Sequence, residues 1–191
     1  ALYLARQNMK RILMIVGSMR KESFNKKLAL VAKELISDRA EVSFLEYKDI
    51  PPMNQDIEYP APEEIERVRR EVKSADGIWF MTAEYNYSYP GVLKNLLDWL
   101  SRPLYKGAPR SDTAIYGKKA TISGVGGKNA TAGARMKLKE LLKFMGVDVM
   151  VENETGVSLA PDSFGTNTLD LSEEAKESLK KQVESFLSYV E

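Results

Sequence analysis

The sequence predicts an α/β fold in which helices cover both faces of a parallel sheet of five strands. Apolar runs of strand length alternate with helical patterns along the chain, and such alternation implies right-handed β–α–β crossovers. With 191 residues, of which 43% are hydrophobic, the chain suits one compact domain with a substantial core. In a sheet of this kind ligands bind beyond the carboxyl ends of the strands, so polar loops at those ends are the candidates for function.

Five short apolar runs are the predicted strands. They are rich in Val, Ile and other large apolar residues and are bounded by polar or Gly-containing segments. They comprise residues 12–16, 42–45, 78–81, 120–123 and 147–151.

Five further segments carry apolar residues at the spacing i, i+3, i+4 and i+7, which places those residues on one buried face of a helix. They lie within residues 24–35, 65–72, 92–100, 134–145 and 175–190. Residues 101–117 and 153–171 contain Pro and Gly and follow neither pattern, so we expect long loops there. Functional loops and plain surface excursions or subunit contacts are equally compatible with these two stretches.

Residues 1–8 precede Met9-Lys10-Arg11, which looks like a natural start. We therefore expect them to be an upstream extension or a remnant of cloning, with a single domain spanning residues 9–191. They are too few and too polar for a secretory signal.

The composition excludes several classes of function. The chain has no Cys and no His, which rules out a Ser-His-Asp hydrolase, a Cys-His nucleophile and a His/Cys zinc site. Lys and Arg number 28 and Asp and Glu 27, so there is no basic excess of the kind a nucleic-acid-binding protein shows. No apolar run is long enough to span a bilayer. We expect a cytoplasmic protein without a metal site, since absent Cys fits a reducing compartment.

The first candidate loop, residues 17–25 (GSMRKESFN), follows the first predicted strand and opens the first helix. Backbone N–H groups at a helix start have no partner within the helix and attract anions. The loop adds the hydroxyls of Ser18 and Ser23, the amide of Asn25 and the guanidinium of Arg20. This donor set predicts a phosphate site. An ordinary helix start, with Ser23 as its cap, is the alternative.

The second loop, residues 82–91 (TAEYNYSYPG), follows the third strand and enters a helix at Pro90. Its three tyrosines within five residues offer flat faces and hydroxyls to an aromatic ligand. Asn86 and the backbone amides offer hydrogen bonds to the edge of a heterocycle. Tyrosines that pack inward or form a subunit interface are the alternative.

The third loop, residues 123–129 (SGVGGKN), follows the fourth strand, and its glycines allow the backbone to approach a ligand closely. Alone it resembles a flexible turn. The three loops together predict a site for a mononucleotide that carries a large flat ring.

These residues resemble the signatures of the NAD(P)H-dependent FMN reductases, a flavodoxin-like family that includes quinone, azo-dye and chromate reductases. The similarity covers residues 9–151. The first motif comprises Gly17, Ser18, Arg20, Ser23, Asn25 and Leu28. The second comprises Glu84, Tyr85, Asn86, Tyr87, Ser88, Pro90, Gly91, Lys94, Asn95, Asp98, Trp99, Ser101 and Arg102. The chain departs from the family at Ala83, where Pro is frequent, and at Tyr89, where a small aliphatic residue is frequent.

The resemblance implies a three-layer sandwich with strand order 2-1-3-4-5 and a site made of twelve residues. The FMN phosphate would be held by Ser18, Arg20, Ser23 and Asn25. The isoalloxazine ring would be held by Glu84, Tyr85, Asn86 and Tyr87. The pyrimidine edge would lie at the third loop, by Ser123, Gly124, Gly126 and Gly127. Trp99 is interpreted as packing and Asp98 as a surface or interface residue. Arg102 is interpreted as a surface residue or as a contact to the nicotinamide phosphate or a second subunit.

The resemblance also implies a ping-pong reaction with FMN as cofactor and NAD(P)H as co-substrate. A hydride would pass to flavin N5, and two electrons would then pass to a quinone, azo compound, free flavin or metal oxyanion. Backbone N–H groups of the third loop would ease the charge that develops on the flavin. No side-chain acid or base is needed, in agreement with the absence of His. A homodimer or homotetramer is implied, with contacts at the second loop and at residues 96–102.

Two rival functions remain compatible with the same fold. A flavodoxin-type electron carrier would bind FMN without NAD(P)H turnover, but such carriers are strongly acidic, whereas this chain has a net charge of +1. A flavin-free binding module is the second rival, because a fold alone does not define a function.

Overall fold

The computed structural model describes the backbone of residues 1–191 and the side chains of all these residues except 5–7. Its sheet is parallel, with the order β2-β1-β3-β4-β5 that the resemblance implied, and a further strand, β6, pairs with β4. The strands are β1 (Arg11–Gly17), β2 (Glu41–Phe44), β3 (Gly77–Thr82), β4 (Lys119–Gly126), β5 (Asp148–Val149) and β6 (Thr155–Ser158).

The strand β6 lies in the stretch 153–171, for which we expected a loop. The fifth strand is correspondingly shorter than expected, because β5 pairs only with Lys119 and Ala120 of β4. The chain then leaves the sheet and returns as β6, which pairs with β4 from Ser123 to Gly126. The eight-residue β4 is therefore covered on this side by two short strands in succession.

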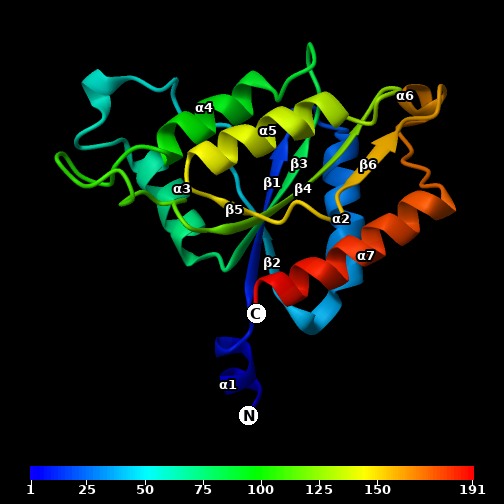
Figure 1. Ribbon diagram of the computed structural model, residues 1–191, viewed down its shortest axis with the longest axis horizontal. Coiled ribbons are helices and arrows are strands. Elements are labelled where there is room, and N and C mark those ends of the chain that lie inside the picture. Colours follow the sequence, from blue (N-terminus) through cyan, green and yellow to red (C-terminus); the bar gives the residue numbers. More distant parts are fainter.

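The five predicted helices are all present. They are α2 (Phe24–Ile36), α3 (Glu63–Ser74), α4 (Gly91–Leu100), α5 (Ala132–Phe144) and α7 (Glu173–Tyr189). The structure adds α1 (Leu2–Gln7), α6 (Ser163–Thr166) and two 3₁₀ turns at Ser37–Arg39 and Gln55–Ile57. The helix α1 lies beyond the amino end of β1, away from the sheet and the other helices (Figure 1).

Two apolar cores lie on opposite faces of the sheet. Apolar residues of α3, α4 and α5 form one core with Leu13, Ile15 and the inward-facing residues of β3 and β4. Those of α2 and α7 form the other core with Ile12, Met14 and Trp79. Figure 1 shows the resulting layers, with α4 and α5 on one side and α2 and α7 on the other. This is a flavodoxin-like three-layer sandwich.

The central strand β3 is buried along its whole length. At its start, a Cβ on Gly77 would come within 2.7 Å of Val190 and 2.9 Å of Phe186, so only Gly lets α7 pack this closely. Next to it, the rings of Trp79 and Phe186 meet edge to face at a centroid distance of 5.8 Å. This packing holds the sheet rigid beneath the loops at its carboxyl edge. Among the helices whose residues are described, none is long and apolar enough to cross a membrane.

Candidate functional site at the carboxyl edge of the sheet

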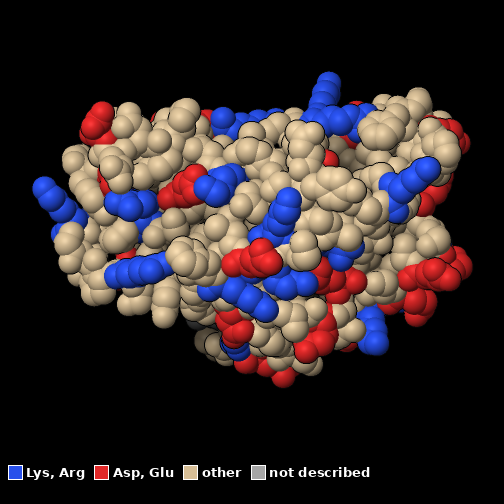
Figure 2. Space-filling model, turned by 45° about the horizontal axis from the view of Figure 1, so that its top comes forward, with Lys and Arg blue, Asp and Glu red and all other residues tan. Residues whose placement is uncertain are grey.

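The three loops singled out in the sequence follow β1, β3 and β4, and these strands are parallel neighbours. Their carboxyl ends therefore meet at one edge of the sheet, at the top of Figure 1. Lys and Arg side chains are interspersed with Asp and Glu on the face that Figure 2 presents, so no large patch of one sign covers it. Recognition at this edge must depend on local groups.

In the first loop, Ser23 caps α2, since its Oγ accepts a hydrogen bond from the Lys26 backbone N–H at 3.2 Å. Asn25 is buried and bonded twice to β4. Its Nδ2 donates to the Val125 carbonyl at 3.2 Å, and its Oδ1 accepts from the Val125 N–H at 2.9 Å. Both side chains thus fix the loop in place, Ser23 on α2 and Asn25 on β4.

The remaining polar residues of the first loop lie nearer the surface. The Ser18 Oγ accepts from the Arg20 backbone N–H at 3.4 Å. The Arg20 guanidinium donates to the Glu22 carbonyl and to the Asn167 side chain, each at 2.6 Å. Asn167 directly follows α6, so a segment far along the chain reaches this loop.

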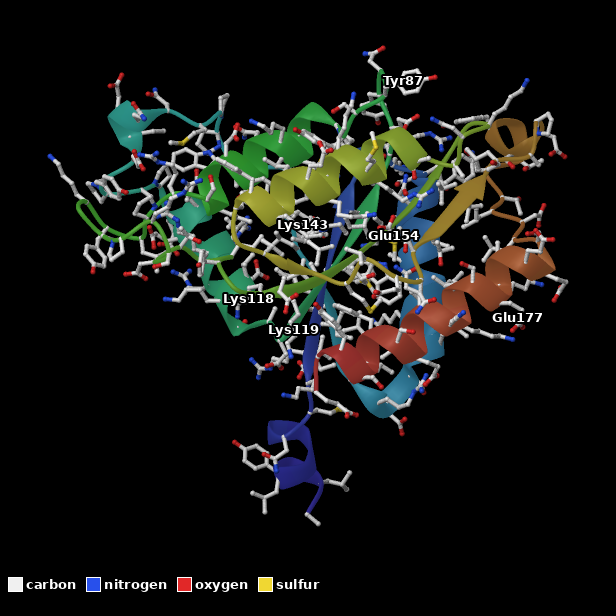
Figure 3. All side chains as sticks on the ribbon, viewed as in Figure 1. Tyr87, Lys118, Lys119, Lys143, Glu154 and Glu177 are labelled. Carbon is white, nitrogen blue, oxygen red and sulfur yellow. The ribbon has the colours of Figure 1, made fainter. Side chains whose placement is uncertain are left out.

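The second loop ends in a tight hairpin turn. The backbone N–H and C=O groups of Tyr85 and Ser88 bond to each other at 3.0 and 3.1 Å, and Asn86 and Tyr87 have φ values of 54° and 65°. Two left-handed residues in succession define a type I′ turn. Tyr85 and Tyr87 are 53% and 70% exposed. Tyr87 stands at the tip of the turn (Figure 3), and one edge of its ring lies near Gly133 at the start of α5, where a Cβ would come within 3.1 Å of Tyr87 Cδ1.

Tyr89, the third tyrosine of the loop, packs partly buried against the core beneath α4. The alternative of inward packing therefore applies to Tyr89, while Tyr85 and Tyr87 keep their flat faces open.

Glu84 joins the second and third loops. One of its carboxylate oxygens accepts from Asn129 Nδ2 at 2.6 Å, and the other accepts from the Ala134 backbone N–H at 2.7 Å. The second bond lies at the start of α5, where Thr131 provides no side-chain cap. A carboxylate there also complements the helix dipole. In this structure Glu84 therefore acts as the cap of α5.

The residues of the third loop differ in accessibility. A Cβ on Gly124 would lie 2.1 Å from Thr131 Oγ1, and one on Gly126 would lie 2.8 Å from Thr131 Cγ2. These two glycines therefore make room for Thr131, whereas Gly127 is exposed and borders open space. Ser123 is fully buried, accepts from Trp79 Nε1 at 3.0 Å and donates to Gln182 Oε1 at 2.8 Å. Its hydroxyl thus points towards α7 on one face of the sheet, and not towards the loops at the carboxyl ends of the strands.

Two hollows adjoin the first loop. One, of about 220 Å³, lies between this loop and the end of β2 and is lined by Ser18, Arg20, Lys26 and Tyr47 among others. The other, of about 370 Å³, continues past Tyr47 to the start of α4. The Tyr47 hydroxyl donates to the Val16 carbonyl at 2.6 Å, and burial raises the pKa of this phenol. Tyr47 therefore remains neutral and holds the wall between the two hollows.

A larger hollow, of about 1060 Å³, lies elsewhere, between the ends of α4 and α5 and the stretch 101–117. Helices run antiparallel to the strands, so these helix ends lie at the opposite edge of the sheet. Arg102 borders this hollow and pairs within the chain with the buried Glu58, at 2.5 and 3.1 Å. Trp99 is buried, as expected, and donates to the Pro51 carbonyl. Among the described residues, no group of His, Cys, Asp or Glu could hold a metal ion.

Three residues beside the first loop were not predicted from the sequence. They are Tyr47, Phe164 and Asn167. Tyr47 follows β2, a strand to which we assigned no functional loop. Phe164 and Asn167 lie in the stretch 153–171, and no local pattern indicates that these residues fold back onto the first loop.

Comparison with known proteins shows the family to which the chain belongs. The sequence pattern of the family described as NADPH-dependent FMN reductase matches residues 10–162. An NAD(P)H-dependent FMN reductase of Pseudomonas aeruginosa is 32% identical over 182 residues, which are 94% of this chain and 95% of that protein. A quinone reductase of Pseudomonas putida is 33% identical over 181 residues, 94% of each chain. The solved structure of FerB, a flavoenzyme NAD(P)H:(acceptor) oxidoreductase from Paracoccus denitrificans, superimposes with a TM-score of 0.83 at 30% identity and covers 95% of this chain and 97% of its own.

Proposed function

The chain belongs to the NADPH-dependent FMN reductase family, and on that basis we propose that it is an FMN-dependent oxidoreductase that carries two electrons from NAD(P)H to quinones or similar flat acceptors. The observation that carries the proposal is the meeting of the first and second loops at one edge of the sheet. A helix start with an arginine follows β1, and exposed aromatic rings follow the neighbouring strand β3. A phosphate joined to a flat ring system requires both kinds of group.

The residues present fit FMN. Uncharged donors and the single guanidinium of Arg20 suit a phosphate at the start of α2, and Ser18 lies beside them. We assign direct phosphate contact to Arg20, Ser18 and the backbone N–H groups of the loop. Ser23 and Asn25 are assigned to the same site, and the contacts of their side chains support the role of shaping the loop.

For the flavin ring we propose Tyr85, Asn86 and Tyr87, whose exposure at the turn supports this role. The exposed Gly127 is the best placed of the third-loop residues to offer a backbone N–H to the pyrimidine edge. Glu84 would contribute by holding the second and third loops at a fixed separation, since it bonds to Asn129 and Ala134. The buried contacts of Ser123, Gly124 and Gly126 support an indirect role for them, in shaping β4 beneath the ring.

When bound, FMN supplies the hydride and electron chemistry, so the protein needs to contribute only binding, orientation and access. This agrees with an edge that carries no His and no Cys. The names of the relatives favour a reductase over an electron carrier of the flavodoxin type, and the net charge of +1 does so as well.

We further propose that the protein works in the cytoplasm as a homodimer or homotetramer. The exposed Tyr85 and Tyr87 offer apolar area that a second subunit would cover, and they stand next to the open side of the proposed flavin site.

The test is a visible spectrum of the purified protein after addition of FMN and desalting, followed by anaerobic NADH, NADPH and then a quinone. We expect retained flavin that bleaches with a nicotinamide and recovers its colour with the quinone. Retained flavin that neither donor bleaches would establish a carrier. Absence of retained flavin and of turnover would refute the assignment of the edge to FMN.

A further inference from the structure

A segment outside the three loops contacts Arg20 of the proposed phosphate site. The helix α6 and the following Asn167 come after residue 162, where the match to the family ends. They lie at the carboxyl edge of the sheet, next to the end of β6 (Figure 1). Phe164 of α6 meets Phe24, the first residue of α2, edge to face at a centroid distance of 5.3 Å. The segment therefore packs directly against the start of the helix that would receive the phosphate.

The exposed Arg20 guanidinium is contacted by this segment and by its own loop. Its Nη2 donates to Asn167 Oδ1, and its Nη1 donates to the Glu22 carbonyl, each at 2.6 Å. The group also lies 4.9 Å from the centre of the Phe24 ring and 5.5 Å from that of Phe164. We call these four contacts the Arg20 clamp.

Both acceptors of the clamp are uncharged, one being a side-chain amide and the other a backbone carbonyl. They orient the guanidinium without neutralising its positive charge. A guanidinium has five N–H donors in a planar fork, and these two bonds leave donors available for an anion. The clamp is therefore suited to present Arg20 to a phosphate.

Asn167 is itself held firmly. Its φ of 53° and ψ of 31° lie in the left-handed region, which Asn tolerates better than most residues. Its backbone carbonyl accepts a hydrogen bond from Lys27 Nζ, and Lys27 also pairs with Glu22 at 3.2 Å. The same residue thus contacts Arg20 through its side chain and α2 through its backbone.

We propose that Asn167 is a positioning residue for the phosphate of the flavin, acting by holding Arg20 in the clamp. The proposal rests on the proposed binding of FMN at the first loop. A mobile arginine side chain loses conformational entropy when it binds a phosphate, whereas a side chain that is already fixed loses little. The affinity for a phosphate monoester therefore depends on a residue 147 positions away in the sequence from the arginine that it holds.

The test compares FMN with riboflavin, which has the same ring and no phosphate, by fluorescence titration of the flavin-depleted protein. The variant Asn167→Gly keeps the left-handed backbone accessible and removes the acceptor. We expect its affinity for FMN to fall by about threefold to tenfold while its affinity for riboflavin stays unchanged. The effect is smaller than that of losing a direct charge-assisted bond to the phosphate, because Asn167 acts on the phosphate only through Arg20.

Two further variants sharpen the test. Asn167→Asp keeps an acceptor at Arg20 but adds a negative charge, so we expect affinity for FMN to fall at least as far, again without change for riboflavin. Thr168→Ala is the matched control, because the Thr168 hydroxyl is exposed and bonds only to the Thr166 carbonyl. It should leave both affinities unchanged. In an Arg20→Ala background, Asn167→Gly should have no additional effect.

The proposal is overturned if Asn167→Gly lowers both affinities equally, or leaves the FMN-to-riboflavin ratio at its wild-type value. An additional effect of Asn167→Gly in the Arg20→Ala background would also overturn it. If Asn167→Gly does not fold, the ratio measured for Asn167→Asp decides. A wild-type protein that binds neither flavin refutes the proposed function instead, so the two failures are distinguishable.

Discussion

The first loop and the turn at residues 85–88 of the second loop stand at the same edge of the sheet but are supported in opposite ways. The first loop is tied to three other parts of the fold, since Ser23 caps α2, Asn25 bonds to β4 and Arg20 bonds to Asn167. The turn at the end of the second loop is closed by two hydrogen bonds of its own, and its two outer tyrosines are mostly exposed. The comparison leads us to propose a division of labour, in which the fixed loop would hold the phosphate of FMN and the open turn would meet acceptors of variable shape.

Asn25→Ala should have the largest effect, because it removes a tie between the first loop and the core. The Val125 N–H and C=O would both lose their partner in a buried place, and each unsatisfied group costs about 1–3 kcal/mol. We expect the free energy of unfolding to fall by about 2–4 kcal/mol, measured by urea denaturation, and affinity for FMN to fall with it. Unchanged stability would show that the first loop is not braced as described.

Arg20→Ala should affect the phosphate alone. A charge-assisted hydrogen bond contributes about 1.5–3 kcal/mol, so affinity for FMN should fall by about tenfold to one-hundredfold in a titration. Riboflavin should bind as it does to the wild type. Equal losses for the two flavins would mean that Arg20 supports the fold rather than the phosphate.

Glu58→Gln breaks a brace that lies far from the first loop. The hydrogen bond from Arg102 holds the pKa of the Glu58 carboxyl below its ordinary value, so this ion pair stabilises the protein above the unfolded-state pKa of about 4.3. Its contribution is lost as the pH falls below that value through the folded-state pKa. We therefore expect the variant to be less stable than the wild type at pH 7, by about 1–2 kcal/mol, and the difference to shrink towards pH 3.

Urea denaturation at the two pH values measures this difference in stability. The ratio of FMN to riboflavin affinity at pH 7 serves as its control and should stay at the wild-type value. A changed ratio would mean that the Glu58–Arg102 pair also affects phosphate binding at the first loop.

Tyr87→Gly should have the smallest effect on stability, and of the opposite sign. A left-handed φ of 65° is unfavourable for Tyr and easy for Gly, so thermal denaturation should show a gain of about 0.5–1 kcal/mol. Affinity for FMN and for riboflavin should fall together, because Tyr87 is assigned to the flavin ring, and kcat/KM for a quinone acceptor should fall as well. Wild-type affinity for both flavins would remove Tyr87 from the proposed ring site.

The sequence predicted the parts of the molecule that depend on local or periodic signals. The five helices follow from apolar spacing, and the first loop follows from a helix start that carries Ser23. The strand β6 and the helix α6 escaped prediction because both are short and neither contains an apolar run or apolar residues at helical spacing.

The roles of single polar residues at the edge were harder to predict, because they depend on distant contacts. The Ser123 hydroxyl bonds to Trp79 and Gln182, which lie 44 and 59 residues away in the sequence. Glu84 is engaged by Ala134 at the start of α5 because Thr131 leaves that helix uncapped. No local pattern around Ser123 or Glu84 encodes these partners.

The outermost strand position beside β4 is divided between β5 and β6, and this division has a consequence for self-association. Strands at an edge can template pairing with another chain, and short strands do so poorly. One edge of this sheet is β2, of four residues, and the other is interrupted between β5, of two residues, and β6, of four. Neither edge presents a long straight ladder of free backbone groups. Pairing of these edges with another chain is therefore disfavoured, and we expect any ordered oligomer to assemble through helices and loops.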